Sequence, residues 1–318
     1  MKTVIRTRVW ILLVSSLIVS ITDSAFGIQL LSVGDVSFPS KLGGSGDSGL
    51  SIISQDGRYV LFASLANNLT LTNDFNLAQP FHFNVFLRDN LKQTTSLVSV
   101  NQNGVGGNGD SFPTGLSTNG QFALFESGAS DLVANDTNNA NDIFVRDVVN
   151  GTTTLVSVSA TGGSAAGSSR GSVLTPDGRY VAFVCTASNL VAGDTNNIPD
   201  VFVRDLQTSL TTLVSLEAVA TNPATLLSSS ESPEITPDGR YVVFYSTATN
   251  LVSNVTTPNE IYVRDLVAGN TICASTNARA IAQSVMGSSN IICCNYSISD
   301  DGQFVAFEAC TKQGEILC

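Results

Sequence analysis

Residues 175–183 read TPDGRYVAF, and residues 236–244 read TPDGRYVVF. Three further copies of this pattern occur in the chain: DGRYVLF from Asp56, NGQFALF from Asn119 and DGQFVAF from Asp301. Successive copies are separated by about 60 residues, and a constant period of this size is typical of repeat architectures. The nonapeptide therefore predicts a fold built from five similar units.

Two other motifs follow the same period. The first is VFLRD, IFVRD, VFVRD and IYVRD, beginning at Val85, Ile143, Val201 and Ile261. The second is SLVSV, TLVSV, TLVSL and TICAS, ending at Val100, Val158, Leu216 and Ser275. Each unit thus contains a short segment before Asp-Gly, the aromatic segment after it, and these two motifs, which we interpret as four strands.

Elementary strand chemistry supports this interpretation. Asp-Gly favours a tight turn, because Gly tolerates positive φ and Asp can bond its own backbone. The two central segments are nearly continuous in apolar residues, which predicts strands buried on both faces. A four-stranded unit of this kind needs similar units beside it. The sequence therefore predicts an all-β fold, a β-propeller of about five four-stranded blades.

The pair PDGRYVAF (176–183) and DVFVRDLQT (200–208) resembles the WD-like repeats of TolB-type propellers, which are found in exported bacterial proteins. The resemblance covers nearly all of residues 28–318. It implies the propeller fold but no particular activity, because propellers host many functions.

The two ends of the repeat region suggest how a ring could close. IQLLSV (28–33) matches the fourth-strand motif, so it could complete a blade whose inner strands lie within residues 290–310. The last repeat lacks a VFVRD strand and is incomplete. Either GEILC (314–318) substitutes for it, or the chain is a fragment of a longer propeller.

Residues 1–27 have the order of a secretory signal peptide. Lys2, Arg6 and Arg8 precede an uncharged apolar run, and Ala25 and Gly27 are the small residues of a cleavage site. The apolar run is too short for a membrane-spanning helix. We expect an exported protein, periplasmic, secreted or at the cell surface, with no membrane span after cleavage.

The net charge is −11, which disfavours nucleic acid as a partner because an acidic surface repels phosphate. An exported chain fits protein or cell-envelope glycan partners. The six cysteines allow disulfides in that compartment, but the sequence leaves their pairing open.

Two loops between the second and third strands carry a pattern suited to a hard cation. NDTNNAND places Asp136, Asn138 and Asp142 in D-x-N-x-x-x-D spacing, and GDTNNIPD repeats the spacing with Asp194, Asn196 and Asp200. Calcium takes carboxylate and amide oxygens, so these residues are candidate calcium ligands. The alternative is that Asx-turns shape the loops without a metal.

Other polar residues offer little convergent chemistry. The repeated Arg-Asp pairs occur once per blade, so we interpret the Asp as starting a turn and the Arg as bonding buried carbonyls or a carboxylate. Glu231 and Glu234 break the repeat pattern and are candidate binding residues near the channel mouth. His82, in an irregular loop of the first blade, is the only histidine and the third candidate.

These observations favour an exported, non-catalytic β-propeller that serves as a protein- or glycan-binding or scaffolding module. Two alternatives stay open. The first is a glycan hydrolase or lyase with carboxylates at the propeller centre. The second is a structural fragment of a larger cell-surface protein.

Overall fold

The computed structural model describes residues 31, 44–70, 82–196, 198–216, 218, 229–287 and 291–311, without the side chains of residues 286, 310 and 311. All of them belong to one compact unit, Leu31–Cys318. The expected signal peptide, the GEILC segment and most of the expected closing strand lie outside the described residues.

The strands follow the predicted repeats. The first blade has β1 (Ser48–Ile53), β2 (Tyr59–Ser64), β3 (Asn84–Asp89) and β4 (Thr94–Leu97). The second has β5 (Ser111–Leu116), β6 (Phe122–Ser127), β7 (Asp142–Asp147) and β8 (Thr152–Leu155). The third has β9 (Ser169–Leu174), β10 (Tyr180–Cys185), β11 (Asp200–Asp205) and β12 (Leu210–Leu213). The fourth has β13 (Ser230–Ile235), β14 (Tyr241–Ser246), β15 (Glu260–Asp265) and β16 (Asn270–Cys273), and β17 (Ile291–Ile298) with β18 (Val305–Thr311) represents the fifth.

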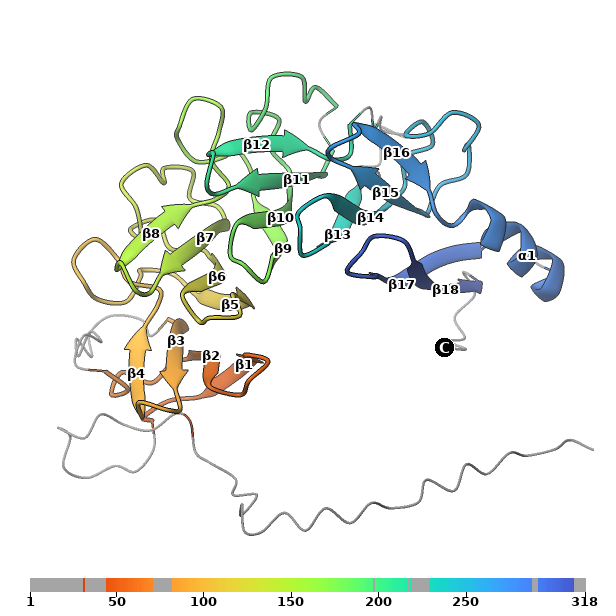
Figure 1. Ribbon diagram of the computed structural model, residues 1–318. Helices are drawn as coiled ribbons and strands as arrows, with labels where there is room; N and C mark the ends of the chain where they lie inside the picture. The colour runs from red at the N-terminus through yellow and green to blue at the C-terminus, as the bar shows by residue number, and fades with distance from the viewer. Residues whose placement is uncertain are drawn as a thin grey trace, which may run out of the picture. The chain divides into compact units, whose positions relative to one another are not determined.

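Within each of the four complete blades the strands pair antiparallel in chain order, as Figure 1 shows. The second and third strands pair along all six residues, for example from Tyr180↔Asp205 to Cys185↔Asp200. These central strands are buried on both faces. The predicted all-β propeller fold of four-stranded blades is confirmed, with two strands of the last repeat in the described part of the chain.

A pair of stacked aromatic rings forms the centre of each complete blade. One ring comes from the second strand and the other lies opposite it on the third, because the antiparallel register places them as direct partners. The pairs are Phe62–Phe86, Phe125–Phe144, Phe183–Phe202 and Phe244–Tyr262, with ring centroids 5.8, 5.6, 5.8 and 5.8 Å apart. Such offset pairs stabilise a core beyond their buried area.

Neighbouring blades contact through an aromatic ring placed on a glycine. A β-carbon added at Gly120 would lie 2.5 Å from the Tyr59 ring of the preceding blade. The same contact joins Phe122 to Gly178, Tyr180 to Gly239 and Tyr241 to Gly302. These glycines also have positive φ, which the turn requires. The Asp-Gly-aromatic motif is therefore both a turn and an inter-blade contact.

Leu31 is the one described residue of the expected closing strand. It packs against the first-blade cluster that contains Val60 and Phe62. Val98, which follows β4, packs in the same way against Ala123 and Phe125 of the second blade. Leu31 therefore occupies the position that the fourth-strand motif predicts, next to the blade that follows it.

The repeated Arg-Asp pairs serve as framework. The Asp89 carboxylate accepts the turn N–H groups of Leu91 and Lys92, at 2.9 and 3.1 Å, as predicted for a turn-starting residue. Its ion-pair partner is Arg58 of the preceding DGRY motif, at 2.9 Å. Arg88 instead donates to the Thr95 hydroxyl at 3.2 Å and to the Gln93 carbonyl at 2.9 Å, and only the carbonyl was expected.

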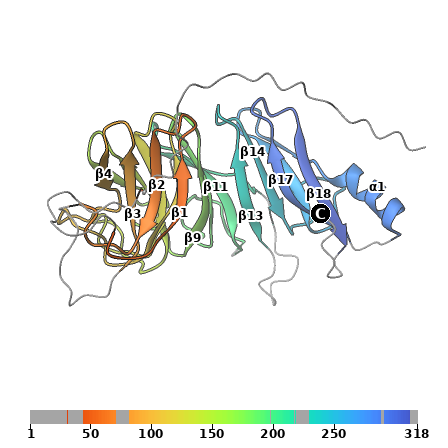
Figure 2. The same ribbon diagram turned by 90° about the horizontal axis from the view of Figure 1, so that it is seen from below.

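One element was not predicted. Helix α1 (Thr276–Met286) follows β16 and ends at Gly287, whose φ of 64° is left-handed. It packs against β17 and β18, beside which it lies in Figure 2. The sequence of this connection breaks the repeat, so the repeat pattern could not reveal the helix.

Candidate functional site

A buried polar tie links the third and fourth strands of every complete blade. The first residue of the third strand bonds the hydroxyl of a serine that follows the fourth strand. That serine oxygen accepts the next backbone N–H, as from Val85 to Ser99 at 3.0 Å. The four pairs are Asn84–Ser99, Asp142–Ser157, Asp200–Ser215 and Glu260–Ser275. Asp142 and Asp200, two of the candidate calcium ligands, thus have a structural role.

The candidate asparagines hold the loops in shape. Asn138 donates its amide hydrogens to Asp142 at 2.7 Å and to the Ala165 carbonyl at 2.8 Å, and its amide oxygen accepts the Ala140 N–H. Asn196 bonds Asp200, the Ala218 carbonyl and the Ile198 N–H in the same way. The Asx-turn interpretation therefore describes these two asparagines, whose amide nitrogen faces the acid.

Asp136 and Asp194 lie in the same two loops as the acids of the ties. Both are 6% exposed. Neither carboxylate oxygen of Asp136 has a hydrogen-bonding partner, nor does Oδ1 of Asp194. A buried carboxylate without a partner is costly, so these two side chains require an explanation.

Burial dominates the titration of all four acids. It raises the pKa of Asp142 to about 6 and that of Asp200 to about 7, against the serine and asparagine hydrogen bonds, which lower them. It also raises the pKa of Asp136 and Asp194. The charge of Asp136 raises the pKa of Asp142 further, and Asp194 acts on Asp200 in the same way. Each loop therefore brings two carboxylates close enough to repel one another.

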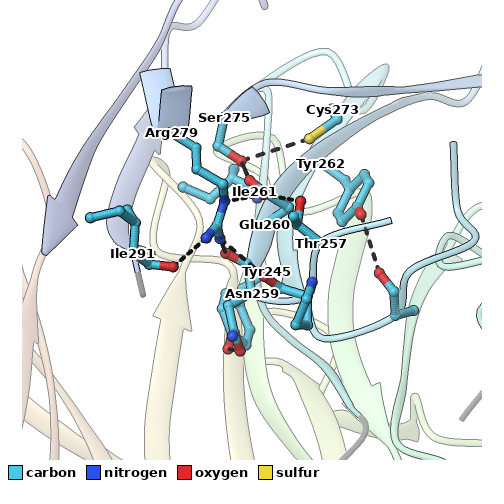
Figure 3. A network of polar contacts seen from close by, with 12 residues as sticks. Tyr245, Thr257, Asn259, Glu260, Ile261, Tyr262, Cys273, Ser275, Arg279 and Ile291 are labelled. Atoms are coloured by element: carbon cyan, nitrogen blue, oxygen red, sulfur yellow. Dashed lines mark hydrogen bonds and ion pairs between the residues drawn. The ribbon is translucent and has the colours of Figure 1, made fainter. Parts of the chain in front are cut away.

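In the fourth blade, a basic side chain of the protein itself balances the charge of the buried acid. Figure 3 shows Arg279 of α1 paired with the fully buried Glu260 of β15. The guanidinium also donates to the carbonyls of Pro258, Asn259 and Ile291. No sequence motif identifies Arg279; its one signal is that a basic residue lies inside a segment that breaks the repeat.

The inner strands place Glu231 and Glu234 on β13, where each has a partner in a neighbouring blade. Glu231 pairs with Arg170 of β9 at 2.9 Å. Glu234 accepts the backbone N–H of Ile298, in β17, at 3.2 Å. A further acid that was not predicted, Glu126 of β6, accepts the backbone N–H and the hydroxyl of Ser172 at 2.9 and 3.0 Å. These contacts form a polar connection between blades along the inner strands.

His82 lies just before β3 in the first blade. Its Nδ1 is 3.4 Å from the Asp110 carboxylate, which also accepts the Phe83 N–H at 2.9 Å. Within the described part of the chain, no hydrogen bond or ion pair links His82 to Glu231 or Glu234. Within the described residues, the three candidate binding residues thus have separate partners and are not brought together by a hydrogen bond or ion pair.

Among the residues that the structure describes, no group of three or more His, Cys, Asp and Glu side chains has an arrangement that could hold a metal ion. Across the same residues, no helix has the length and apolar character needed to cross a membrane.

The blades and their ties define the class of the protein, a β-propeller of four-stranded blades. No protein-family model matches the sequence, and no curated protein is similar to it. Solved structures of similar fold include a protein assigned to TolB from Agrobacterium tumefaciens (18% identity, TM-score 0.40, 71% of this chain and 63% of that one). TolB from Acinetobacter baumannii is also similar (13% identity, TM-score 0.41, 85% and 56%).

An oligogalacturonate lyase from Vibrio parahaemolyticus matches at 14% identity and a TM-score of 0.46, over 82% of this chain and 58% of that one. The chain thus spans less than two thirds of the length of each of these proteins. TolB-type propellers are thus among the solved structures to which this chain is similar, as the repeats implied. At these identities the similarities concern the fold alone.

Proposed function

We propose that the chain is an exported, non-catalytic β-propeller that acts as a protein-binding and scaffolding module. Export rests on residues 1–27, whose order of basic, apolar and small residues is that of a signal peptide. The bonding of Glu231, Glu234 and Glu126 to neighbouring blades supports a framework role for the inner-strand carboxylates. A binding role then needs a surface, and the inter-blade contact indicates one.

The single observation that carries the proposal concerns the aromatic ring and the glycine that would form one more inter-blade contact. Neither is covered by a partner in the described part of the chain. Phe304 stands where Tyr59, Phe122, Tyr180 and Tyr241 stand in the other repeats, but it is 70% exposed. Gly57 stands where the receiving glycines stand, and no atom of the described residues lies within 4 Å of a β-carbon placed there. Leu50 and Ile53 of the adjoining β1 strand are each 64% exposed.

The two open halves are complementary to each other, because the aromatic ring and the glycine are the same pair that joins every other blade. Both are exposed in one chain, so we assign the partner of β1 as the β17–β18 hairpin of a second copy. A head-to-tail contact of this kind is heterologous and can extend a chain of copies. An apolar, sheet-like face favours a protein rather than a glycan as the partner.

Light scattering after size-exclusion chromatography tests the proposal with two variants. Ile53→Glu places a charge on the apolar face of β1, and Phe304→Ser removes the aromatic ring. We expect the wild-type chain to associate with increasing concentration and each variant to remain monomeric. An equimolar mixture of the two variants should form dimers and nothing larger, because it contains one intact half of each kind.

The matched control is Val149→Ser, at a residue that is 74% exposed on the β7–β8 turn and away from both faces. It should associate like the wild type. A wild-type chain that stays monomeric at all concentrations would overturn the assignment, and so would a mixture of variants that forms no dimer.

A further inference from the structure

The complete blades balance charge at the polar tie in different ways. The first blade has the neutral Asn84, and the fourth has Glu260 paired with Arg279. In the fourth blade the position equivalent to Asp136 and Asp194 is the buried Val255, which carries no charge. The second and third blades have two buried acids each, and among the described contacts neither loop has a basic partner.

This contrast within one chain indicates a missing positive charge. In the fourth blade, which has one buried acid at this place, the chain supplies its own cation, Arg279. Where the second acid is present, carboxylate oxygens remain buried without partners, at Asp136 and at Asp194. Two buried carboxylates without a cation would impose a large desolvation cost.

We propose that Asp136 and Asp194 each bind one divalent cation of the calcium type as the direct carboxylate ligand of their loop. Asp142 and Asp200 supply the second negative charge of each site. Asn138 and Asn196, which the spacing predicted as ligands, position the acids, because their amide oxygens already accept backbone N–H groups. The proposal does not depend on self-association.

The chemistry of the loops favours a hard cation. Their donors are carboxylate, hydroxyl and carbonyl oxygens, and calcium accepts six to eight such ligands in irregular geometry, whereas magnesium demands a near-ideal octahedron. The nearby soft donor is Cys185, which is fully buried. A single thiol does not make a zinc site, which typically has three or four thiolate, imidazole or carboxylate ligands.

The test measures bound calcium by equilibrium dialysis and atomic emission on the purified chain. We expect two calcium ions per chain for the wild type, one for Asp136→Asn or Asp194→Asn, and none for the double variant. Asp300→Asn changes an exposed acid outside both loops and should still bind two. Magnesium chloride at the same concentration should compete weakly.

Thermal unfolding supplies a second readout that a purely structural role would not reproduce. Saturating calcium should raise the wild-type Tm by about 5 °C relative to EDTA, because a ligand that binds only the folded chain stabilises it. In EDTA, Asp136→Asn should melt at or above the wild-type temperature, since it removes a buried unpartnered charge. In calcium the order should reverse.

Three results would overturn the proposal. The first is a wild-type chain that binds no calcium and melts at the same temperature in calcium and in EDTA; the loop acids would then be neutralised by protons. The second is an Asp136→Asn chain that still binds two ions. The third is an Asp136→Asn chain that is destabilised equally in both buffers, which would assign Asp136 a structural role only.

Discussion

At the scale of single residues, comparison of the repeats identifies a position at which the third blade departs from the other three complete blades. In three blades two serines face each other across the first and second strands, as Ser111 and Ser127 do at 2.8 Å. The third blade has Cys185 opposite Ser169, whose hydroxyl has no hydrogen-bonding partner. The Ala187 N–H also reaches only the sulfur, at 3.4 Å.

We therefore expect Cys185→Ser to stabilise the protein by about 1 kcal/mol, because it completes a buried hydrogen-bonded pair. The measurement is the free energy of unfolding in urea. The reverse change in the second blade, Ser127→Cys, should destabilise by a similar amount. If both substitutions destabilise equally, the packing around residue 185 accommodates sulfur better than a hydroxyl group, and the serine pairs of the other blades do not predict the behaviour of the third.

The limit of sequence reasoning is visible at this scale. The D-x-N-x-x-x-D spacing identified all six loop residues, but it could not separate the asparagines that bond backbone from the acids left unpaired. That distinction depends on Ser157, Ser215 and the carbonyls of Ala165 and Ala218, which come from the following strand and connection. Spacing within a loop contains no information about them.

At the scale of elements, an ion pair fixes the turn ends of the central hairpins. Arg179, just before β10, pairs with Asp205 at the end of β11 at 2.8 Å, and its guanidinium lies 4.6 Å from the centre of the Tyr180 ring. The hydrogen bonds from Arg179 are the main reason that the pKa of Asp205 falls to about 2. The second blade has Gln121 in place of this arginine, donating to Asp147 at 3.1 Å.

This pair predicts a pH dependence whose sign follows from the lowered pKa. The ionised Asp205 stabilises the fold above its unfolded pKa of about 4, and this contribution is lost as the pH falls from about 4 through about 2. Arg179→Gln should therefore destabilise the protein modestly at pH 7 and have almost no effect at pH 2, since the pair is partly exposed.

Thermal unfolding between pH 2 and pH 7 measures this difference. Gln121→Arg in the second blade is the matched gain and should stabilise near neutral pH only. A cost of Arg179→Gln that is the same at pH 2 and pH 7 would show that the arginine acts through its packing on Tyr180 and not through its charge.

Strands were the predictable elements because each carries its own local signal, an Asp-Gly turn followed by apolar and β-branched residues. Helix α1 carries none that the repeat could reveal. Its N-cap position, Ser275, does not cap the helix, because the hydroxyl donates to Glu260 instead. The helix is positioned by Arg279, and that role depends on the fourth-blade loop rather than on helix propensity.

At the scale of the whole molecule, the inner strands contact in series: β1 with β5, β5 with β9, β9 with β13 and β13 with β17. The apolar clusters follow the same order. Phe125 of the second blade and Phe244 of the fourth belong to clusters with no common member, whereas Val203 of the third blade shares a cluster with Phe244. Stability should therefore combine blade by blade, as in other repeat proteins.

A double-mutant cycle tests this expectation. Phe125→Leu and Phe244→Leu should each cost about 1–2 kcal/mol and add to within about 0.5 kcal/mol, because no contact joins the two sites. Val203→Ala combined with Phe244→Leu should deviate from additivity by more than about 0.5 kcal/mol, since both changes relax one cluster. Urea unfolding provides the free energies, and an unchanged slope of free energy against urea confirms that each variant loses the same structure. Strong coupling between Phe125 and Phe244 would instead mean that the blades fold as one unit, and the inter-blade rings on Gly178 and Gly239 would be the path by which they do so.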